Sequence, residues 1–238
     1  MNTIKLSEVS LTSNLIFRAL LYGEAGAGKT TLLGTFPTPM LIFDFDQKLK
    51  PLIGKPGIEV IQYTVDGYQS CSKIFTQFKR DFREARKDPK WKTLGLDSLS
   101  SFDTINLRHF CLLAGKGEED APTLPVYQDQ SNFYSFWFTE LKTILDKNVI
   151  ITAHEFYNID GESGIHSIQP LITGKSILFK LPQLFEDVWY LERKGGSIEE
   201  RWLHYKKMKK EVATSATLQG DGLIKNPTYE EIIKRLKQ

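Results

Sequence analysis

One stretch near the start of the chain, LIFRALLYGEAGAGKTTLL at residues 15–33, strongly limits what this sequence can fold into. An apolar run typical of a strand buried on both faces leads directly into a glycine-rich segment. After Lys29 and Thr30, the residues from Thr31 to Leu33 read as the start of a helix. Glycines inside an ordered segment cost conformational entropy, so something there must need their backbone freedom or their missing side chains. Residues 23–30 match G-x-x-x-x-G-K-S/T at every fixed position, and the strand–loop–helix setting predicts a phosphate-binding P-loop.

The predicted loop assigns a chemical task to each of its parts. Successive backbone N–H groups in such a loop form an anion-binding concavity, and the following helix adds its own unpaired N–H groups. We expect Lys29 to reach the β- and γ-phosphates of a nucleotide and the Thr30 hydroxyl to bind Mg²⁺. The predicted nucleotide-binding residues are Gly23, Glu24, Ala25, Gly26, Ala27, Gly28, Lys29, Thr30 and Thr31.

Composition is that of an ordinary globular protein. The chain has 238 residues, of which 41% are hydrophobic and 25% are charged, and its net charge of +2 is too small to imply nucleic acid by itself. Cys71 and Cys111 fall in predicted amphipathic helices, which favours buried thiols over a disulfide or a metal site. Without a signal-peptide pattern or an apolar run of membrane-spanning length, we expect a cytoplasmic protein with no membrane partner.

Predicted strands and helices alternate along the chain, which favours one α/β domain with a mostly parallel central sheet flanked by helices. The expected strands are residues 15–22, 39–46, 57–63, 91–96 and 148–154. The first expected helix starts at Thr31, and further helices are expected over residues 68–87, 98–114 and 127–147. A last helix is expected from Thr228, opened by Pro227 at its first position. Residues 156–175 look like a loop, and residues 186–207 look like a β-hairpin that turns at Gly195 and Gly196. The single domain would cover residues 1–238, with a core at about 14–206 and a C-terminal extension of strand and helix at 207–238.

Polar residues directly follow several predicted strands, at the end of a parallel sheet where ligands bind. They are Asp44, Asp46, Asp97, Ser98, His154 and Glu155. Strands also end in polar residues for no functional reason, but beside a P-loop these residues look like one nucleotide site. We expect Asp97 to bind Mg²⁺ directly or through water. Either Asp46 or Asp44 would orient and deprotonate the attacking water, and His154 would sense the γ-phosphate.

In the order of these pieces the chain resembles small RecA-fold ATPases of phage genomes, a group related to the RecA and RadA recombinases and to phage single-strand annealing proteins. The resemblance extends from about Leu15 to Trp202 and rests on YGEAGAGKTTL, LIFDFDQKLKPL, LGLDSLSSF and VIITAHE. It implies a RecA-like fold with ATP and Mg²⁺ as cofactors. It also implies a catalytic acid at Asp46, where the family carries glutamate, and a γ-phosphate sensor at His154, where the family usually carries glutamine. A histidine can still donate a hydrogen bond to phosphate.

The resemblance further implies partners, namely single-stranded DNA and other copies of the chain in a ring or a filament. Two DNA-contacting loops of RecA-like recombinases match residues 115–128 and 156–175 by position. Neither segment is strongly basic, although phosphate contacts normally come from Lys and Arg. Many RecA-fold ATPases also insert a cation from a C-terminal strand into a neighbour's site. Lys207 and Lys209, on one side of a predicted strand, are the candidates for this role in trans, and a basic edge strand in solvent is the equally good alternative.

The function that the sequence favours is an ATP-binding, Mg²⁺-dependent ATPase that acts in phage DNA recombination, single-strand annealing or replication, in the host cytoplasm. One alternative is a phosphotransferase such as a nucleotide kinase. Kinases commonly close an arginine-bearing lid over the phosphates, and residues 156–175 contain no arginine. The other alternative is an assembly or loader protein that uses nucleotide only as a switch. ATP is favoured over GTP because the chain has no convincing guanine-reading N-K-x-D motif.

Overall fold

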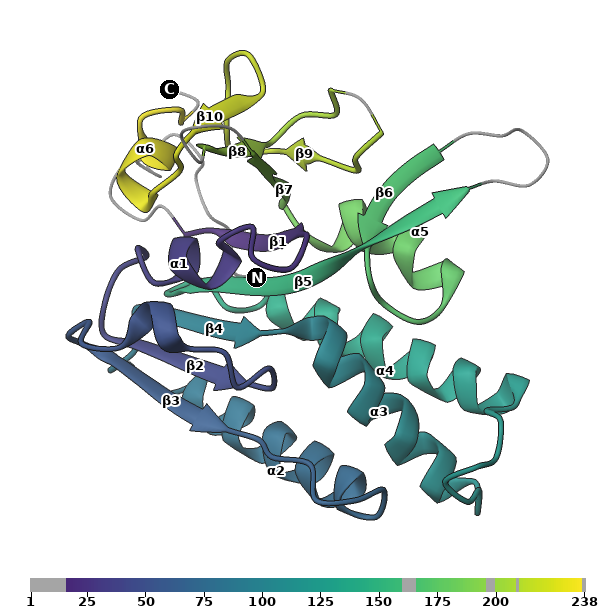
Figure 1. The fold of residues 1–238 in the computed structure, drawn as a ribbon. Coiled ribbons are helices and arrows are strands. Elements are labelled where there is room, and N and C mark those ends of the chain that lie inside the picture. Colours follow the sequence, from purple (N-terminus) through teal and green to yellow (C-terminus); the bar gives the residue numbers. More distant parts are fainter. Residues whose placement is uncertain (1–15, 160–165, 196–199, 209, 237–238) are drawn as a thin grey trace, which may run out of the picture.

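The centre of the fold is a mostly parallel sheet, shown in Figure 1. A computed structural model describes residues 16–159, 166–195, 200–208 and 210–236, and every structural statement below concerns these residues. The parallel strands lie side by side in the order β3 (Ile58–Gln62), β2 (Met40–Asp44), β4 (Thr93–Asp97), β5 (Asn148–Ile159), β1 (Arg18–Gly23) and β7 (Asp187–Lys194). The antiparallel strands β8 (Glu200–His204) and β10 (Leu223–Lys225) extend the sheet beyond β7, while β6 (His166–Pro170) pairs with β5 and the short β9 (Thr214–Ser215) pairs with β7.

Helices cover both faces of this sheet, as the alternation of predicted elements indicates (Figure 1). One face carries α2 (Ser70–Ala85), α3 (Leu99–Leu113), α4 (Leu124–Leu141) and α5 (Lys175–Leu184). The other carries α1 (Lys29–Leu33), the 3₁₀ turn η2 (Lys50–Leu52) and α6 (Tyr229–Ile233). The predicted α/β fold with a mostly parallel sheet between helices is therefore confirmed.

Aromatic side chains fill both cores. On the α2–α4 face, the ring of Phe78 packs 4.6 Å from that of Phe102 and 5.6 Å from that of Trp137, measured between ring centroids. On the α1 face, Phe17 packs 5.6 Å from Trp189. Burying such large rings on both faces contributes about 25 cal/mol per Å² of apolar surface removed from water. The central strands are therefore held rigidly, and so are the residues at their ends.

The central strands are apolar because both of their faces are covered. Every residue of β2 and β4 is buried, and β1 is buried from its second residue onward. β3 lies at the edge of the sheet and is largely exposed. The buried strands end in Asp44 and Asp97, so the two carboxyl groups reach the same edge of the sheet as the end of β1.

Most of the other predicted helices and strands are present, although their first and last residues differ from those expected. The hairpin of β7 and β8 is confirmed. Its turn was expected at Gly195 and Gly196, and residues 196–199 lie outside the described residues. The helix expected at 127–147 is α4, which starts earlier with a proline in its first turn and ends at Leu141. Pro227 is not the first residue of the last helix. Thr228 caps that helix instead, since its Oγ1 accepts a hydrogen bond from Glu231 N at 3.2 Å. Cys71 and Cys111 are buried free thiols in α2 and α3, as predicted.

Two expectations about the second half of the chain are wrong. The segment 156–175 is not a loop, because β5 continues to Ile159 and pairs antiparallel with β6, and α5 begins at Lys175. The strand expected to carry Lys207 ends earlier, at His204. The carboxylate of Glu211 lies 2.9 Å from His204 Nδ1 and accepts a hydrogen bond from Met208 N at 2.9 Å, so the chain folds back after β8. Lys207 is exposed outside any strand, and Lys209 lies outside the described residues.

Within the described ranges, no helix has both the length and the apolar character needed to cross a membrane.

Gly23 is required where β1 passes close to β7. A Cβ at this position would lie 2.2 Å from the carbonyl oxygen of Leu191. We expect Gly23→Ala to lower the free energy of unfolding by about 1–3 kcal/mol, because a clash with backbone cannot be relieved by rotating a side chain. Urea unfolding measures this change. The control is Gly117→Ala, where the nearest neighbour of a new Cβ would be Asp120 Oδ2 at 3.5 Å. Equal losses in the two variants would contradict the explanation.

Candidate nucleotide-binding site

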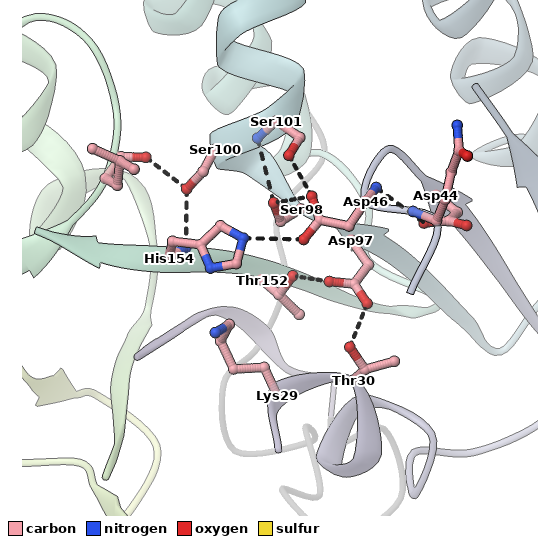
Figure 2. A network of polar contacts seen from close by, with 12 residues as sticks. Lys29, Thr30, Asp44, Asp46, Asp97, Ser98, Ser100, Ser101, Thr152 and His154 are labelled. Atoms are coloured by element: carbon pink, nitrogen blue, oxygen red, sulfur yellow. Dashed lines mark hydrogen bonds and ion pairs between the residues drawn. The ribbon is translucent and has the colours of Figure 1, made fainter. Parts of the chain in front are cut away.

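The register of the parallel strands gathers the predicted site residues at one edge of the sheet. Gly23 at the end of β1 lies opposite His154 in β5, and Asp44 at the end of β2 lies opposite Asp97 at the end of β4. The glycine loop follows β1 directly and leads into α1. Figure 2 shows that the side chains of Lys29, Thr30, Asp46, Asp97 and His154 lie together there.

The P-loop has the backbone that its glycines predict. Gly28 adopts a left-handed conformation with φ of 99°, immediately before α1. The Lys29 side chain is only 7% exposed, and its Nζ donates to the carbonyl oxygens of Gly23 and Glu24, each at 2.8 Å. Burial lowers the pKa of Lys29, and the negative charges of Asp97 and Asp46 oppose that shift. The lysine is therefore held at the loop, beside two carboxyl groups.

Asp97 is buried between two threonine hydroxyls. Thr30 Oγ1 donates to its Oδ2 at 2.6 Å, and Thr152 Oγ1 donates to its Oδ1 at 2.5 Å. Burial raises the pKa of Asp97, and the negative charges of Asp46 and Asp44 raise it further. A buried carboxylate and a hydroxyl in direct contact are oxygen ligands of the kind that Mg²⁺ takes, and a cation would relieve the cost of the buried charge. The residues present therefore fit a magnesium ion.

The two aspartates at the end of β2 have different surroundings, which separates their roles. Asp44 is fully buried, and its carboxylate accepts hydrogen bonds from the backbone N–H groups of Asp46 and Gln47 and from Gln62 Nε2. It stabilises the turn after β2. The Asp46 side chain lies on the cavity wall and contacts His154 Nε2 at 3.1 Å. Of these two aspartates, only Asp46 lines the cavity.

Asp46 is held in its ionised form. Burial by itself would raise its pKa, but hydrogen bonds from His154, Ser101 and Ser98 outweigh burial and lower the pKa to about 2. Ser98 Oγ donates at 2.9 Å, and Ser101 Oγ donates to the same oxygen, Oδ1. A carboxylate with so low a pKa orients a water molecule well but accepts its proton only weakly.

The backbone of His154 is tied to the segment that follows β6. His154 N donates to Ser100 Oγ at 2.9 Å, and Ser100 Oγ donates to the carbonyl oxygen of Leu171 at 2.7 Å (Figure 2). Leu171 N in turn donates to the carbonyl oxygen of His154 at 2.7 Å. These hydrogen bonds join the backbone of His154 to α3 and to the residue that follows β6.

These residues line a cavity of about 320 Å³, which is at the lower end of the range for small-molecule sites. Its wall contains most of the predicted loop and three polar residues of the strand ends: Ala25, Gly26, Gly28, Lys29, Thr30, Thr31, Asp46, Asp97 and His154. Three predicted loop residues have other surroundings. Gly23 packs against the backbone of Leu191, Ala27 is fully buried in the core, and the Glu24 carboxylate lies 3.4 Å from Arg193 Nε.

Sequence reasoning missed several residues of the site. They are Lys48, Pro51 and Arg201 on the cavity wall, and Thr152 and Ser101 beside the carboxylates. Ser98, which also donates to Asp46, is among the residues named from the sequence. Some of the missed residues carry a signal in hindsight. Thr152 is a polar residue in the middle of a buried apolar strand, and Ser101 closely follows Asp97 in the first turn of α3. Arg201 carries none, because it is far from the loop in the sequence.

Comparison with known proteins assigns the sequence to a family. A family model described as an AAA domain matches residues 17–216. No curated protein matches the sequence. Among solved structures, the RadB recombinase is 13% identical, with 79% of each chain covered and a TM-score of 0.42. The flagellar accessory protein FlaH from Methanocaldococcus jannaschii is 12% identical, with 93% of this chain and 92% of that chain covered and a TM-score of 0.42.

Proposed function

We propose that this chain, which belongs to the AAA domain family, is a RecA-like ATPase that binds ATP with Mg²⁺ and hydrolyses it. The observation that carries the proposal is the contact between Thr30 and the buried Asp97, next to the buried Lys29, in one cavity. A lysine for phosphate and a hydroxyl–carboxylate pair for magnesium are the parts that phosphoryl transfer from a nucleotide needs.

Each residue of the site then has a defined task. Lys29 and the loop N–H groups neutralise the phosphate oxygens, and Thr30 and Asp97 hold the metal. When bound, Mg²⁺ supplies charge neutralisation at the phosphates. Asp46 stays ionised at neutral pH and orients the attacking water by accepting its hydrogen bond. His154, whose Nε2 lies 3.1 Å from Asp46, would contact the γ-phosphate.

We propose the β5–β6 hairpin as a contact for single-stranded DNA. Two aromatic side chains stand exposed on it, with Phe156 at 47% and Tyr157 at 59% exposure. Bases of single strands stack on exposed aromatic rings regardless of their sequence. The hydrogen bonds between His154, Ser100 and Leu171 connect this hairpin to the nucleotide cavity. We therefore propose that ATP hydrolysis and DNA contact are coupled through His154.

The finer assignment follows from the resemblance of the sequence to phage RecA-fold ATPases. On that basis we propose a role in phage DNA recombination, single-strand annealing or replication, by a homo-oligomer in the host cytoplasm. DNA contact by residues 115–128, which run from just after α3 into the first residues of α4, stays a prediction. So does the trans-acting role of Lys207 and Lys209.

Phosphate release from ATP, measured with and without single-stranded DNA, tests the proposed function. We expect Mg²⁺-dependent release that DNA stimulates. Transfer of the phosphoryl group to a nucleoside monophosphate instead of water would favour a kinase. Tight ATP binding without turnover under either condition would favour a nucleotide switch.

Tyr157→Ala tests the hairpin. We expect it to weaken the affinity for a fluorescent single-stranded oligonucleotide by about tenfold, because stacking is worth about 1–3 kcal/mol per base. Fluorescence anisotropy measures the affinity. The control is Phe136→Ala on α4, which removes a ring that is 67% exposed on another part of the surface. If both variants keep the wild-type DNA affinity, the hairpin is not the contact.

A further inference from the structure

The β7–β8 hairpin brings two arginines to the P-loop of the same chain. Arg193 of β7 and Arg201 of β8 lie directly opposite each other in the antiparallel pair. Arg201 forms part of the cavity wall together with Lys29, Thr30 and Asp97. Neither arginine is among the site residues predicted from the sequence.

The Arg201 side chain lies directly over Gly28. A Cβ built on Gly28 would be 2.6 Å from Arg201 Nε and 3.3 Å from its Cζ, so the space that a side chain would occupy there is filled by the guanidinium. Gly28 is the last glycine before Lys29, in the stretch that cradles phosphates. The guanidinium is therefore next to the place where a phosphate chain would lie.

The backbone of Arg201 is fixed by its neighbour in the chain's C-terminal region. Arg201 N donates to Asn226 Oδ1 at 3.1 Å, and Asn226 N donates to the carbonyl oxygen of Arg201 at 2.6 Å. The next residue, Trp202, pairs with Lys225 of β10. These contacts anchor the arginine in a sheet, and side chains on rigid elements are placed more precisely than those on loops.

Arg193 has a different environment although it lies opposite Arg201. Its Nε lies 3.4 Å from Glu24 Oε1, and both side chains are more than 40% exposed. It offsets a negative charge on the rim of the loop and is absent from the residues that line the cavity. The hairpin therefore provides a test residue and a control, because Arg201 lines the cavity and Arg193 lies on its rim.

The charges of the cavity explain why a guanidinium would be placed there. The wall carries Lys29, Lys48 and Arg201 against the two carboxyl groups of Asp46 and Asp97, so the cations outnumber the acids on a surface that a phosphate chain would neutralise. Arginine presents a planar fork of N–H donors that matches phosphate oxygens. We infer that Arg201 binds the phosphate chain of the nucleotide in cis, together with Lys29. This inference rests on the proposed function, since it names a further ligand of the same nucleotide.

Calorimetric titration of each folded variant with ATP and Mg²⁺ tests the inference. We expect Arg201→Ala to lower the affinity by about tenfold to a hundredfold, the range for loss of a hydrogen bond to a charged group. Arg201→Gln keeps a polar side chain but lacks the charge and the reach of the guanidinium, and it should lose a similar factor. Arg201→Lys keeps the charge but not the fork, so it should recover part of the affinity. The difference between wild type and Arg201→Ala should shrink at high salt, which a purely structural role would not cause.

Arg193→Ala is the matched control, and we expect it to change the affinity by less than about fivefold, as for an exposed ion pair. Wild-type affinity in both Arg201→Ala and Arg201→Gln would overturn the inference and leave the proposed function intact. An equal loss in Arg193→Ala would also overturn it, because the effect would then reflect the general charge of the hairpin. Failure of the wild-type chain to bind ATP at all would instead remove the proposed function.

Mixed chains test whether Arg201 acts in cis. Neither Lys29→Ala nor Arg201→Ala carries both cations, so a mixture should bind ATP no more tightly than the Arg201→Ala chain does by itself. Recovery of the wild-type affinity in the mixture would show that Arg201 serves a neighbouring chain, and would overturn the assignment in cis.

Discussion

Lys29→Ala is expected to lower the affinity for ATP by at least about a hundredfold while leaving the fold intact. The reason is that Lys29 is the buried cation of the loop, and charge-assisted hydrogen bonds to phosphate are among the strongest that a side chain makes. Its Nζ donates to two carbonyl oxygens of the loop, and the lysine is not part of either hydrophobic core, so its loss should leave the fold intact. Titration with a fluorescent ATP analogue measures the affinity, and thermal melting monitored by circular dichroism checks the fold.

Lys48→Ala is the control for Lys29→Ala. Lys48 also lies on the cavity wall, but it is exposed to solvent, so its removal should cost far less affinity. A folded Lys29→Ala chain that binds ATP like the wild type would disprove the assignment of the P-loop. A large loss in Lys48→Ala alone would move the main phosphate contact to the other side of the cavity.

Asp97→Asn is expected to reduce Mg²⁺-dependent hydrolysis by about a hundredfold or more, with much of the ATP affinity retained. A neutral amide has nearly the shape of the carboxylate but is a much poorer ligand for Mg²⁺. The size of the effect is that of removing one preorganised group from the stabilisation of a transition state. Phosphate release measured against MgCl₂ concentration gives the result, and a curve that matches the wild type would place the metal elsewhere.

The stability of Asp97→Asn provides an independent check with a definite sign. Burial raises the pKa of Asp97 in the folded chain, so its ionisation favours the unfolded chain once the pH exceeds the unfolded value of about 3.9. The wild type loses this stability as pH rises toward the folded pKa, and the asparagine variant does not. At pH 7 the variant should therefore melt at the same temperature as the wild type or higher, although it has lost activity.

Asp103→Asn is the matched control for Asp97→Asn. Asp103 is also a carboxyl group whose pKa is raised by burial, and it accepts hydrogen bonds from Thr173, Tyr134 and Gln130 between α3 and its neighbours. It is not part of the cavity wall. We expect this variant to change stability but to keep the wild-type dependence of turnover on Mg²⁺. A shared loss in the two variants would mean that turnover reports general damage to the fold.

The sequence by itself determined the parts of this protein that depend on local pattern. The P-loop and the apolar strand before it are encoded within residues 15–33, because glycine spacing and unbroken hydrophobicity act over neighbouring residues. The alternation of strands and helices was sufficient for a mostly parallel sheet, and this in turn placed Asp97 and His154 at the edge where the loop ends. The hairpin of β7 and β8 was equally visible from its glycines.

Only the tertiary structure decided which side chains meet. The sequence gives no reason to choose between Asp44 and Asp46. In the structure, the Asp44 carboxylate accepts a backbone hydrogen bond from the turn that follows β2, whereas the Asp46 carboxylate contacts His154. The fold-back of the chain after His204 removes Lys207 from the sheet, whereas the pairing of β8 with β7 sets Arg201 over Gly28. The physical reason is that a contact between distant residues depends on strand order, register and the direction of each side chain. Those quantities are set by packing of the whole sheet and not by any local run of residues.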